Sequence, residues 1–254
     1  MKWTYELKEK EVFRMKRILV MVLRNLFRVP FYWFKLCHIA AHADDYTEEE
    51  RYAFLKKIVT MANTGGNVTI EAHGEENIPK EEGFVFYPNH QGLYDMLAIV
   101  DACPRPCSGV IKKEAANIPF IKQVIACLKA LAIDREDVRQ SMQVIMQVTK
   151  EVQNGRSYVI FAEGTRSKFG NKLLEFKGGS FKAATKAKCP IVPIALIDSF
   201  KPFDINSAAP VTVQVHFLKP MLFEEYKDMK TPEIAAEVKR RIEETIAKYE
   251  VVTA

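Results

Sequence analysis

His90 and Asp95 are the residues of this sequence best placed to transfer a proton. They follow residues 84–88, an apolar and aromatic run that predicts a buried strand. Apolar residues then recur at spacings of three and four, which predicts a helix over 93–102. With His90 in the turn and Asp95 in the first helical turn, the carboxylate can hold one imidazole nitrogen and leave the other as a general base. A histidine and an aspartate five residues apart also occur as a purely structural pair, so this pattern alone is weak.

A second polar cluster follows the next strongly apolar run, residues 158–161. Residues 162–190 contain seven Lys or Arg against two Glu, with small residues between them. Arg166 can bind two phosphate oxygens and Lys177 adds a point charge. Gly178 and Gly179 would let backbone N–H groups at the start of the next helix face the same anion. A solvated basic loop is the alternative, and the position of this loop after a strand, like that of His90, favours the phosphate site.

Strands and helices alternate along most of the chain. Strands are predicted near residues 68–72, 84–88, 107–112, 131–133, 157–161, 191–197 and 211–217. Helices are predicted near residues 93–102, 119–129, 137–153, 179–188 and 232–249. Such alternation predicts an α/β fold with a central, largely parallel or mixed sheet flanked by helices. Functional groups of such sheets gather at the carboxyl ends of the strands.

The first part of the chain has a different character. Residues 1–37 have a net charge of +6, from nine Lys or Arg and three Glu, whereas the whole chain has +5. On a helix, four of the basic residues fall close to one line, with Leu, Phe and Trp on the other faces: Arg17, Arg24, Arg28 and Lys35. This pattern is typical of helices that lie in a membrane interface. The alternative is a helix packed on the body of the protein with a solvated basic edge.

Two further signals shape this region. Pro30 predicts a kink or the start of a second helix, so the phase of the basic line need not continue across it. No run reaches the roughly 18 uncharged residues that a transmembrane helix needs. Thr47 and Glu50 form a capping box that predicts the start of the next helix. We therefore predict an amphipathic, membrane-associated helical segment over residues 1–64 and an α/β domain over residues 65–254.

Composition and missing motifs exclude several classes of protein. A hydrophobic content of 48% and a charged content of 27% are those of a globular protein. The five cysteines are scattered and no secretory signal precedes them, which favours reduced thiols in the cytosol. The sequence has no Gly-x-Ser-x-Gly elbow, Walker loop or dinucleotide fingerprint. We predict no metal, no cofactor and no nucleic-acid partner.

Four segments, in this order, resemble the motifs of the glycerolipid acyltransferase family. They are Asn89-His90-x4-Asp95, Leu131–Arg135, Phe161–Ser167 and Ile191–Ala195. One of them alone is weak evidence, but four in order are specific, and they span residues 89–195. Two positions depart from the family pattern. Ala162 replaces a common proline, and Gln91-Gly92 stands where a serine is common.

The resemblance implies transfer of a fatty acyl group from an acyl-CoA or acyl carrier protein thioester to the free sn-2 hydroxyl of lysophosphatidic acid, which gives phosphatidic acid. His90, held by Asp95, would take the hydroxyl proton, and the alkoxide would attack the thioester directly. Residues 191–195 would line the acyl or donor channel, and backbone amides near residues 89–92 would stabilise the oxyanion. By resemblance, the substrate-binding residues are Asn89, Arg135, Glu163, Gly164, Thr165, Arg166 and Lys177. Among them, Arg135, Gly164, Arg166 and Lys177 would hold the acceptor phosphate, and Glu163 would shape the loop or pair with a nearby cation.

The same resemblance implies a peripheral or monotopic protein on the cytoplasmic face of the cell membrane. One alternative function is a related acyltransferase that uses glycerol 3-phosphate or another lysophospholipid as acceptor. A more distant one is a non-catalytic protein that binds anionic membranes through its basic N-terminal segment.

Overall fold

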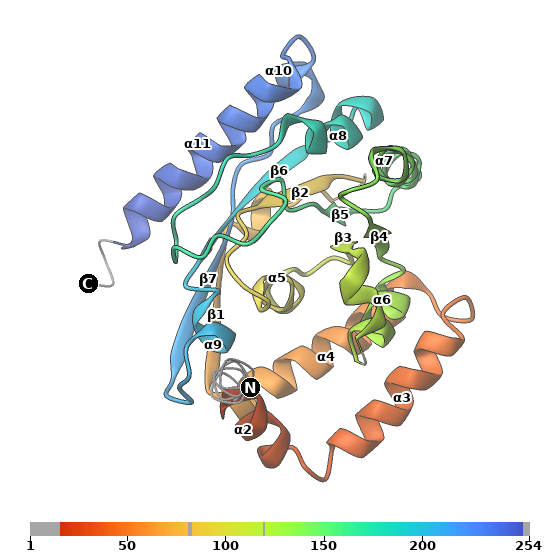
Figure 1. Cartoon of the computed structure of the whole chain (residues 1–254), viewed down its shortest axis with the longest axis vertical. Coiled ribbons are helices and arrows are strands. Elements are labelled where there is room, and N and C mark those ends of the chain that lie inside the picture. Colours follow the sequence, from red (N-terminus) through yellow and green to blue (C-terminus); the bar gives the residue numbers. More distant parts are fainter. Residues whose placement is uncertain (1–15, 81–82, 119, 251–254) are drawn as a thin grey trace, which may run out of the picture.

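A central sheet lies between two layers of helices in the computed structural model, which describes residues 16–80, 83–118 and 120–250 (Figure 1). Within these residues the sheet has seven strands in the order β1-β7-β6-β2-β5-β3-β4. The strands are β1 (Val68–His73), β2 (Val85–Pro88), β3 (Ser108–Lys112), β4 (Leu131–Ile133), β5 (Tyr158–Val159), β6 (Ile191–Ile197) and β7 (Val211–Phe217).

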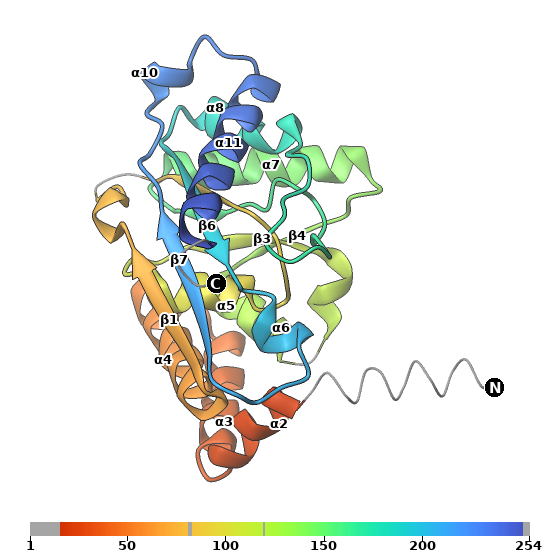
Figure 2. The ribbon, with the colours of Figure 1, turned by 90° about the vertical axis from the view of Figure 1, so that its left-hand side faces the viewer.

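The sheet is mixed. β6, β2, β5, β3 and β4 run parallel to one another, whereas β7 runs antiparallel to β6 and parallel to the edge strand β1. Figure 2 shows β1 and β7 side by side along this edge. The predicted α/β fold with a largely parallel or mixed sheet is confirmed.

Helices cover both faces of the sheet (Figure 1). One layer contains α3 (Val29–Ala41), α4 (Glu48–Gly66), α5 (Asp95–Ala102) and α6 (Ile121–Leu128), and the other contains α7 (Val138–Gln153), α8 (Lys182–Ala187) and α11 (Thr231–Glu250). Short helices α2 (Lys16–Arg24), α9 (Lys201–Asp204) and α10 (Phe223–Tyr226) complete the described set, with 3-10 turns at Glu75–Asn77, Lys113–Asn117 and Gly178–Phe181.

Strand β6 separates the two hydrophobic cores. Val192, Ile194 and Leu196 pack in the core under α4 and α5. Ile191 and Ala195 pack in the core under α7 and α11. This alternation follows from the period of two along a strand. Core packing therefore accounts for the apolar character of these residues, and the idea that residues 191–195 line the acyl or donor channel stays a prediction.

Helix α4 begins at the predicted capping box. Glu50 N–H donates to the Thr47 hydroxyl at 3.2 Å and Thr47 N–H donates to the Glu50 carboxylate at 2.8 Å, so the capping box is present. The helix ends at Gly65 and Gly66, and Asn67 follows as a C-cap in the left-handed conformation. A Cβ on Gly65 would lie 2.4 Å from Asn25 Nδ2, and one on Gly66 would lie 2.4 Å from the Met21 methyl carbon. The glycines therefore allow α2 to pack closely on α4.

The orientation of α2 corrects the predicted basic stripe. The Arg17 guanidinium is buried and donates to the backbone carbonyls of Gly66, Ala209 and Pro202. The basic line thus begins on the side of α2 that faces the body, while the apolar side chains of Leu19 and Leu23 are 57% exposed. Neither a membrane-facing position nor a solvated edge describes Arg17.

Pro30 acts as predicted, since it lies in the first turn of the separate helix α3. None of the described helices is long and apolar enough to cross a membrane. The division of the chain at residue 64 stays a prediction, and residues 1–15 of the predicted segment lie outside the described residues.

His216, which is buried and stacks on the exposed His73 at the β1/β7 edge, makes stability depend on pH. Burial lowers the pKa of His216 to about 4, and the nearby His73 and Lys248 act in the same direction. The unfolded chain, with a histidine pKa near 6.5, takes up this proton before the folded chain does, so stability should fall as the pH falls through this window. We expect His216 to remove about 3 kcal/mol of unfolding free energy between pH 6.5 and pH 4.

Urea unfolding at a series of pH values measures this effect, and His216→Gln provides the control. Carboxylates contribute their own slope in both proteins, so the prediction concerns the difference between them. An unchanged slope in His216→Gln would contradict it.

Candidate active site

The predicted site residues come together at the carboxyl ends of the parallel strands. His90 follows β2 and Glu163 follows β5, while Arg135 follows β4. β2 lies between β5 and β6, so the turn after each of these three strands lies at one edge of the sheet. Ser199 follows β6 and lies beside this group. The topology brings residues that are far apart in sequence to a single edge.

His90 and Asp95 are in direct contact. The His90 Nδ1 atom lies 2.7 Å from Asp95 Oδ2, with the histidine side chain 18% exposed and the aspartate side chain 1% exposed. Phe161 stacks on the imidazole, with 4.1 Å between ring centroids. A carboxylate on Nδ1 places the proton on that atom and leaves the lone pair on Nε2. Nε2 forms no hydrogen bond within the described part of the chain, so it is available to a substrate.

Asp95 is held by three more donors. The backbone N–H groups of Gln91 and Gly92 donate to it at 2.7 and 3.0 Å, and the Ser199 hydroxyl donates at 2.6 Å. The predicted use of backbone amides near residues 89–92 for an oxyanion is therefore wrong for these two, because their hydrogens already point at Asp95. Ser199 was not predicted. Its signal was its position just past a strand, as for His90.

Glu163 joins the two motif loops, in keeping with the loop-shaping role expected for it. Its buried carboxylate accepts from His90 N–H at 2.7 Å and from Leu174 N–H at 2.8 Å. Ser167 N–H in turn donates to the His90 carbonyl at 2.7 Å. Burial raises the pKa of Glu163, and the two N–H donors partly oppose this. The geometry therefore favours a positioning role.

Asn89 has a comparable position. Its side chain is buried, donates to the Leu196 carbonyl at 3.0 Å and accepts from Leu196 N–H at 2.7 Å. These two bonds tie the end of β2 to β6. We infer that Asn89 positions the His90 turn, in place of the substrate contact predicted from the sequence.

Gly164 is the meeting point of two predicted cations. Arg135 donates a hydrogen bond to the Gly164 carbonyl. A Cβ on Gly164 would lie 2.8 Å from Lys177 Nζ, and φ is +72° there, so both space and backbone conformation favour glycine. Thr165 and Arg166 are exposed. Their side chains form no hydrogen bond or ion pair with any residue the structure describes.

Other groups near the site limit its chemistry. No serine or cysteine side chain among the described residues bonds to the His90 ring, and the Ser199 hydroxyl donates to Asp95 Oδ1, the carboxylate oxygen that the imidazole does not contact. No group of three His, Cys, Asp or Glu residues in the described ranges is arranged to hold a metal ion. Gly178 packs against the backbone of Pro232 in α11, so helix packing accounts for a glycine at this position. The arrangement offers an oriented base beside a cationic loop.

Comparison with known proteins gives a consistent family. The family model described as Acyltransferase matches residues 69–197. The 1-acyl-sn-glycerol-3-phosphate acyltransferases of Salmonella typhimurium and Escherichia coli are each 32% identical to this chain over 167 residues. Each match covers 65% of this chain and 68% of the relative.

A solved structure has the same fold. The crystal structure of the 1-acyl-sn-glycerophosphate (LPA) acyltransferase, PlsC, from Thermotoga maritima superposes with a TM-score of 0.68 at 21% identity. The match covers 89% of this chain and 97% of that chain. At this identity the likeness concerns the fold alone.

Proposed function

This chain belongs to the acyltransferase family, and we propose that it transfers a fatty acyl group to the free sn-2 hydroxyl of 1-acylglycerol-3-phosphate, which gives phosphatidic acid. The observation that carries the proposal is the His90–Asp95 pair, with Nε2 unbonded beside a cationic loop. The relatives named for this reaction support the choice of acceptor.

The proposed reaction is direct. Nε2 of His90 accepts the proton of the acceptor hydroxyl, and the oxygen attacks the thioester carbonyl. The tetrahedral intermediate then expels the thiolate, which takes a proton from the imidazolium. Asp95 stabilises the positive charge that His90 holds between these two steps. No acyl-enzyme is needed, in keeping with the absence of a described serine or cysteine on the His90 ring.

Arg135, Arg166 and Lys177 are proposed to bind the acceptor phosphate. Lys177 and Arg135 meet at Gly164, and Arg166 precedes Ser167, whose N–H donates to the His90 carbonyl. A phosphate held by these cations would place the glycerol hydroxyl toward the histidine ring. Charge-assisted bonds to phosphate are stronger than neutral ones, and Arg166 is exposed and ready to form them.

The donor is proposed to be an acyl-CoA or acyl carrier protein thioester. We also propose a peripheral position on the cytoplasmic face of the cell membrane, with α2 and α3 toward the bilayer. Exposed apolar side chains on this segment support it, among them Phe27 at 97% and Phe34 at 73%. The lipid acceptor and the lipid product then stay in the same membrane interface as the enzyme.

Product analysis tests the function. Purified protein is incubated with lysophosphatidic acid and each of the two thioesters, and the lipid products are identified by mass spectrometry. Glycerol 3-phosphate and a lysophospholipid with a larger head group serve as competing acceptors. We expect phosphatidic acid as the main product. A clear preference for another acceptor, or no transfer from either donor, would overturn the proposal.

Arg166→Ala is expected to raise the KM for lysophosphatidic acid by about tenfold to a hundredfold, with a smaller effect on kcat, because a charge-assisted bond to phosphate is lost. Initial rates at varied acceptor and fixed donor measure this. Lys168→Ala removes the same charge two residues away and serves as the matched control. A rise in the KM for the thioester instead would move Arg166 to the donor site.

A further inference from the structure

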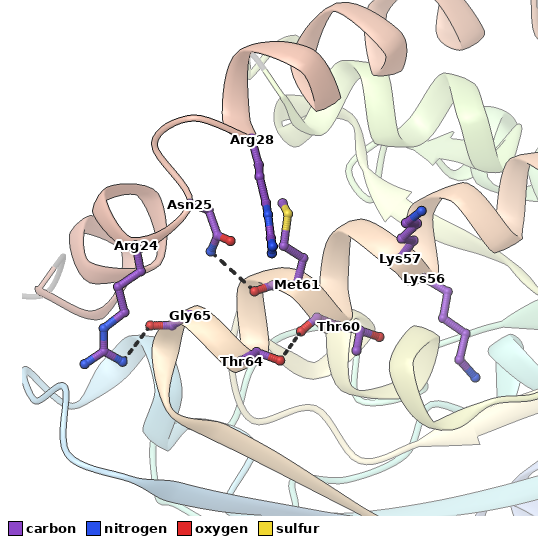
Figure 3. A pocket seen from close by; sticks show the side chains of 9 residues that line it. All are labelled: Arg24, Asn25, Arg28, Lys56, Lys57, Thr60, Met61, Thr64 and Gly65. Atoms are coloured by element: carbon purple, nitrogen blue, oxygen red, sulfur yellow. Dashed lines mark hydrogen bonds between the residues drawn. The ribbon is translucent and has the colours of Figure 1, made fainter.

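A basic hollow lies between α4 and the segment that joins α2 to α3 (Figure 3). Its volume is about 490 Å³. It is lined by Arg24, Asn25, Arg28, Lys56, Lys57, Thr60, Met61, Thr64 and Gly65, and none of these belongs to the four motif segments. Four of the nine are cations and none is a carboxylate. We call it the α2–α4 pocket.

The cations of the α2–α4 pocket are not neutralised within the described residues. Arg24 donates to the Gly65 carbonyl at 3.1 Å and to Asn67 Oδ1 at 2.6 Å, and Lys56 donates to the Cys103 carbonyl at 2.9 Å. These bonds hold two cations in place and leave their charge uncompensated. Arg28 and Lys57 are exposed and form no hydrogen bond or ion pair with any residue in the described ranges.

The nearest acidic group on α5 has its own partners. Asp101 accepts from the Thr60 hydroxyl and from Asn63 Nδ2, so its two oxygens are turned to α4. Several uncompensated cations around a hollow of this size fit a phosphate group, whose oxygens would accept from Arg28 and Lys57.

The segment that supplies Arg24 and Arg28 also carries exposed apolar side chains. Leu23 is 57% exposed, Leu26 52% and Phe27 97%, and Phe31 and Phe34 continue the row on α3 at 62% and 73%. Phe27 directly precedes Arg28, so the chain that supplies a pocket cation also supplies the most exposed aromatic ring. Cations next to exposed Leu and Phe match the boundary between phospholipid head groups and acyl chains.

We propose that the α2–α4 pocket binds the phosphate of an anionic glycerophospholipid in the bilayer, as a lipid site separate from the place of acyl transfer. The row of Leu and Phe enters the acyl layer beside it. The pocket also connects to the active site through α2, because Arg17 donates to the Pro202 carbonyl in α9 at 3.2 Å. Phe200 and Asp204, at the ends of α9, lie against Gly92. The proposal rests on the membrane position proposed above and not on the reaction.

Vesicle binding by the full chain tests the proposal. Sedimentation compares vesicles of phosphatidylcholine alone with vesicles that contain phosphatidylglycerol as the minor component. Arg28→Ala with Lys57→Ala should weaken binding to the anionic vesicles by about 30-fold, since each cation near such a surface contributes about a factor of five. Lys122→Ala with Lys150→Ala removes the same charge from exposed positions on α6 and α7, and it should change binding by less than about twofold.

Further arms separate the possible outcomes. Equal losses in the two double variants would show a diffuse charge effect and overturn the pocket. Binding of inorganic phosphate is measured by isothermal titration calorimetry. If the protein binds phosphate as tightly as it binds the vesicles, the ligand is not a lipid and the proposal is overturned. The proposal is also overturned if the parent protein binds both kinds of vesicle equally well. His90→Ala should bind vesicles like the parent, so a failed reaction and a failed pocket are distinguishable. If the alanine variant does not fold, Arg28→Gln with Lys57→Gln replaces it.

Discussion

His90→Ala is expected to lower kcat for acyl transfer by about 10²–10⁴, the usual contribution of a general base. The variant loses the free Nε2 lone pair, together with the Nδ1 bond to Asp95 and the stacking on Phe161. Single-turnover transfer from a labelled thioester to lysophosphatidic acid measures the chemical step. The KM for the acceptor should change little, because the cations that bind phosphate remain.

The fold should survive this change. Asp95 keeps the Gln91 and Gly92 N–H donors and the Ser199 hydroxyl, so its buried charge stays solvated by the protein. Circular dichroism and a thermal unfolding midpoint near that of the parent serve as the control. Near-parent activity in a folded His90→Ala protein would exclude His90 as the base.

Asp95→Ala should harm both activity and stability. Two backbone N–H groups and one hydroxyl would lose their acceptor in a site where the aspartate is 1% exposed, and we expect the unfolding free energy to fall by about 3 kcal/mol. The kcat should fall by about 10²–10⁴, because the proton on Nδ1 is no longer fixed and the imidazolium is no longer stabilised. Urea unfolding and initial rates measure the two effects.

Two variants separate positioning from general damage. Ser199→Ala removes one donor from the same carboxylate, so it should lower the unfolding free energy by about 1 kcal/mol and leave most activity. Asp95→Asn keeps the size of the side chain but removes the charge that stabilises the imidazolium, so it should lower kcat and cost less stability than Asp95→Ala. If Asp95→Asn keeps the parent rate, Asp95 has only a structural role.

The sequence was a good guide to elements because hydrophobic period and turn residues act locally. The strand near 84–88 and the helix near 93–102 are both present, as β2 and α5. The pairing of strands was not available from local signals. β7 runs antiparallel to β6, and nothing in the apolar run of residues 211–217 indicates a direction.

The candidate site was predicted in part for the same reason. His90 and Asp95 are close in sequence, so their contact followed from one turn. The roles of Glu163 and Asn89 depend on backbone groups at Leu174 and Leu196, which only the fold brings near. The type of a polar residue in a motif segment does not indicate whether its side chain binds a ligand or a neighbouring strand.

The basic N-terminal helix shows where periodicity misleads. The line through Arg17 and Arg24 was correct as geometry, but it does not tell which side of a helix faces the body. Backbone carbonyls left over at the end of α4 and near Ala209 provide acceptors for Arg17, so a guanidinium is buried where an apolar residue was expected. The hydrogen bonds from Arg17 to the Gly66, Ala209 and Pro202 carbonyls outweigh desolvation in a way that single-helix patterns cannot anticipate.

Glu163 has a consequence for protein engineering. Its carboxylate accepts from His90 N–H and Leu174 N–H, and Ser167 N–H donates to the His90 carbonyl. These hydrogen bonds join the loop after β2 and the loop after β5 into one unit, which we call the loop joint. A chimera that imports either loop alone from a relative would break bonds at both ends of this joint. Swaps aimed at new acceptor specificity should therefore transplant both loops together, with the residue at position 163 taken from the same parent.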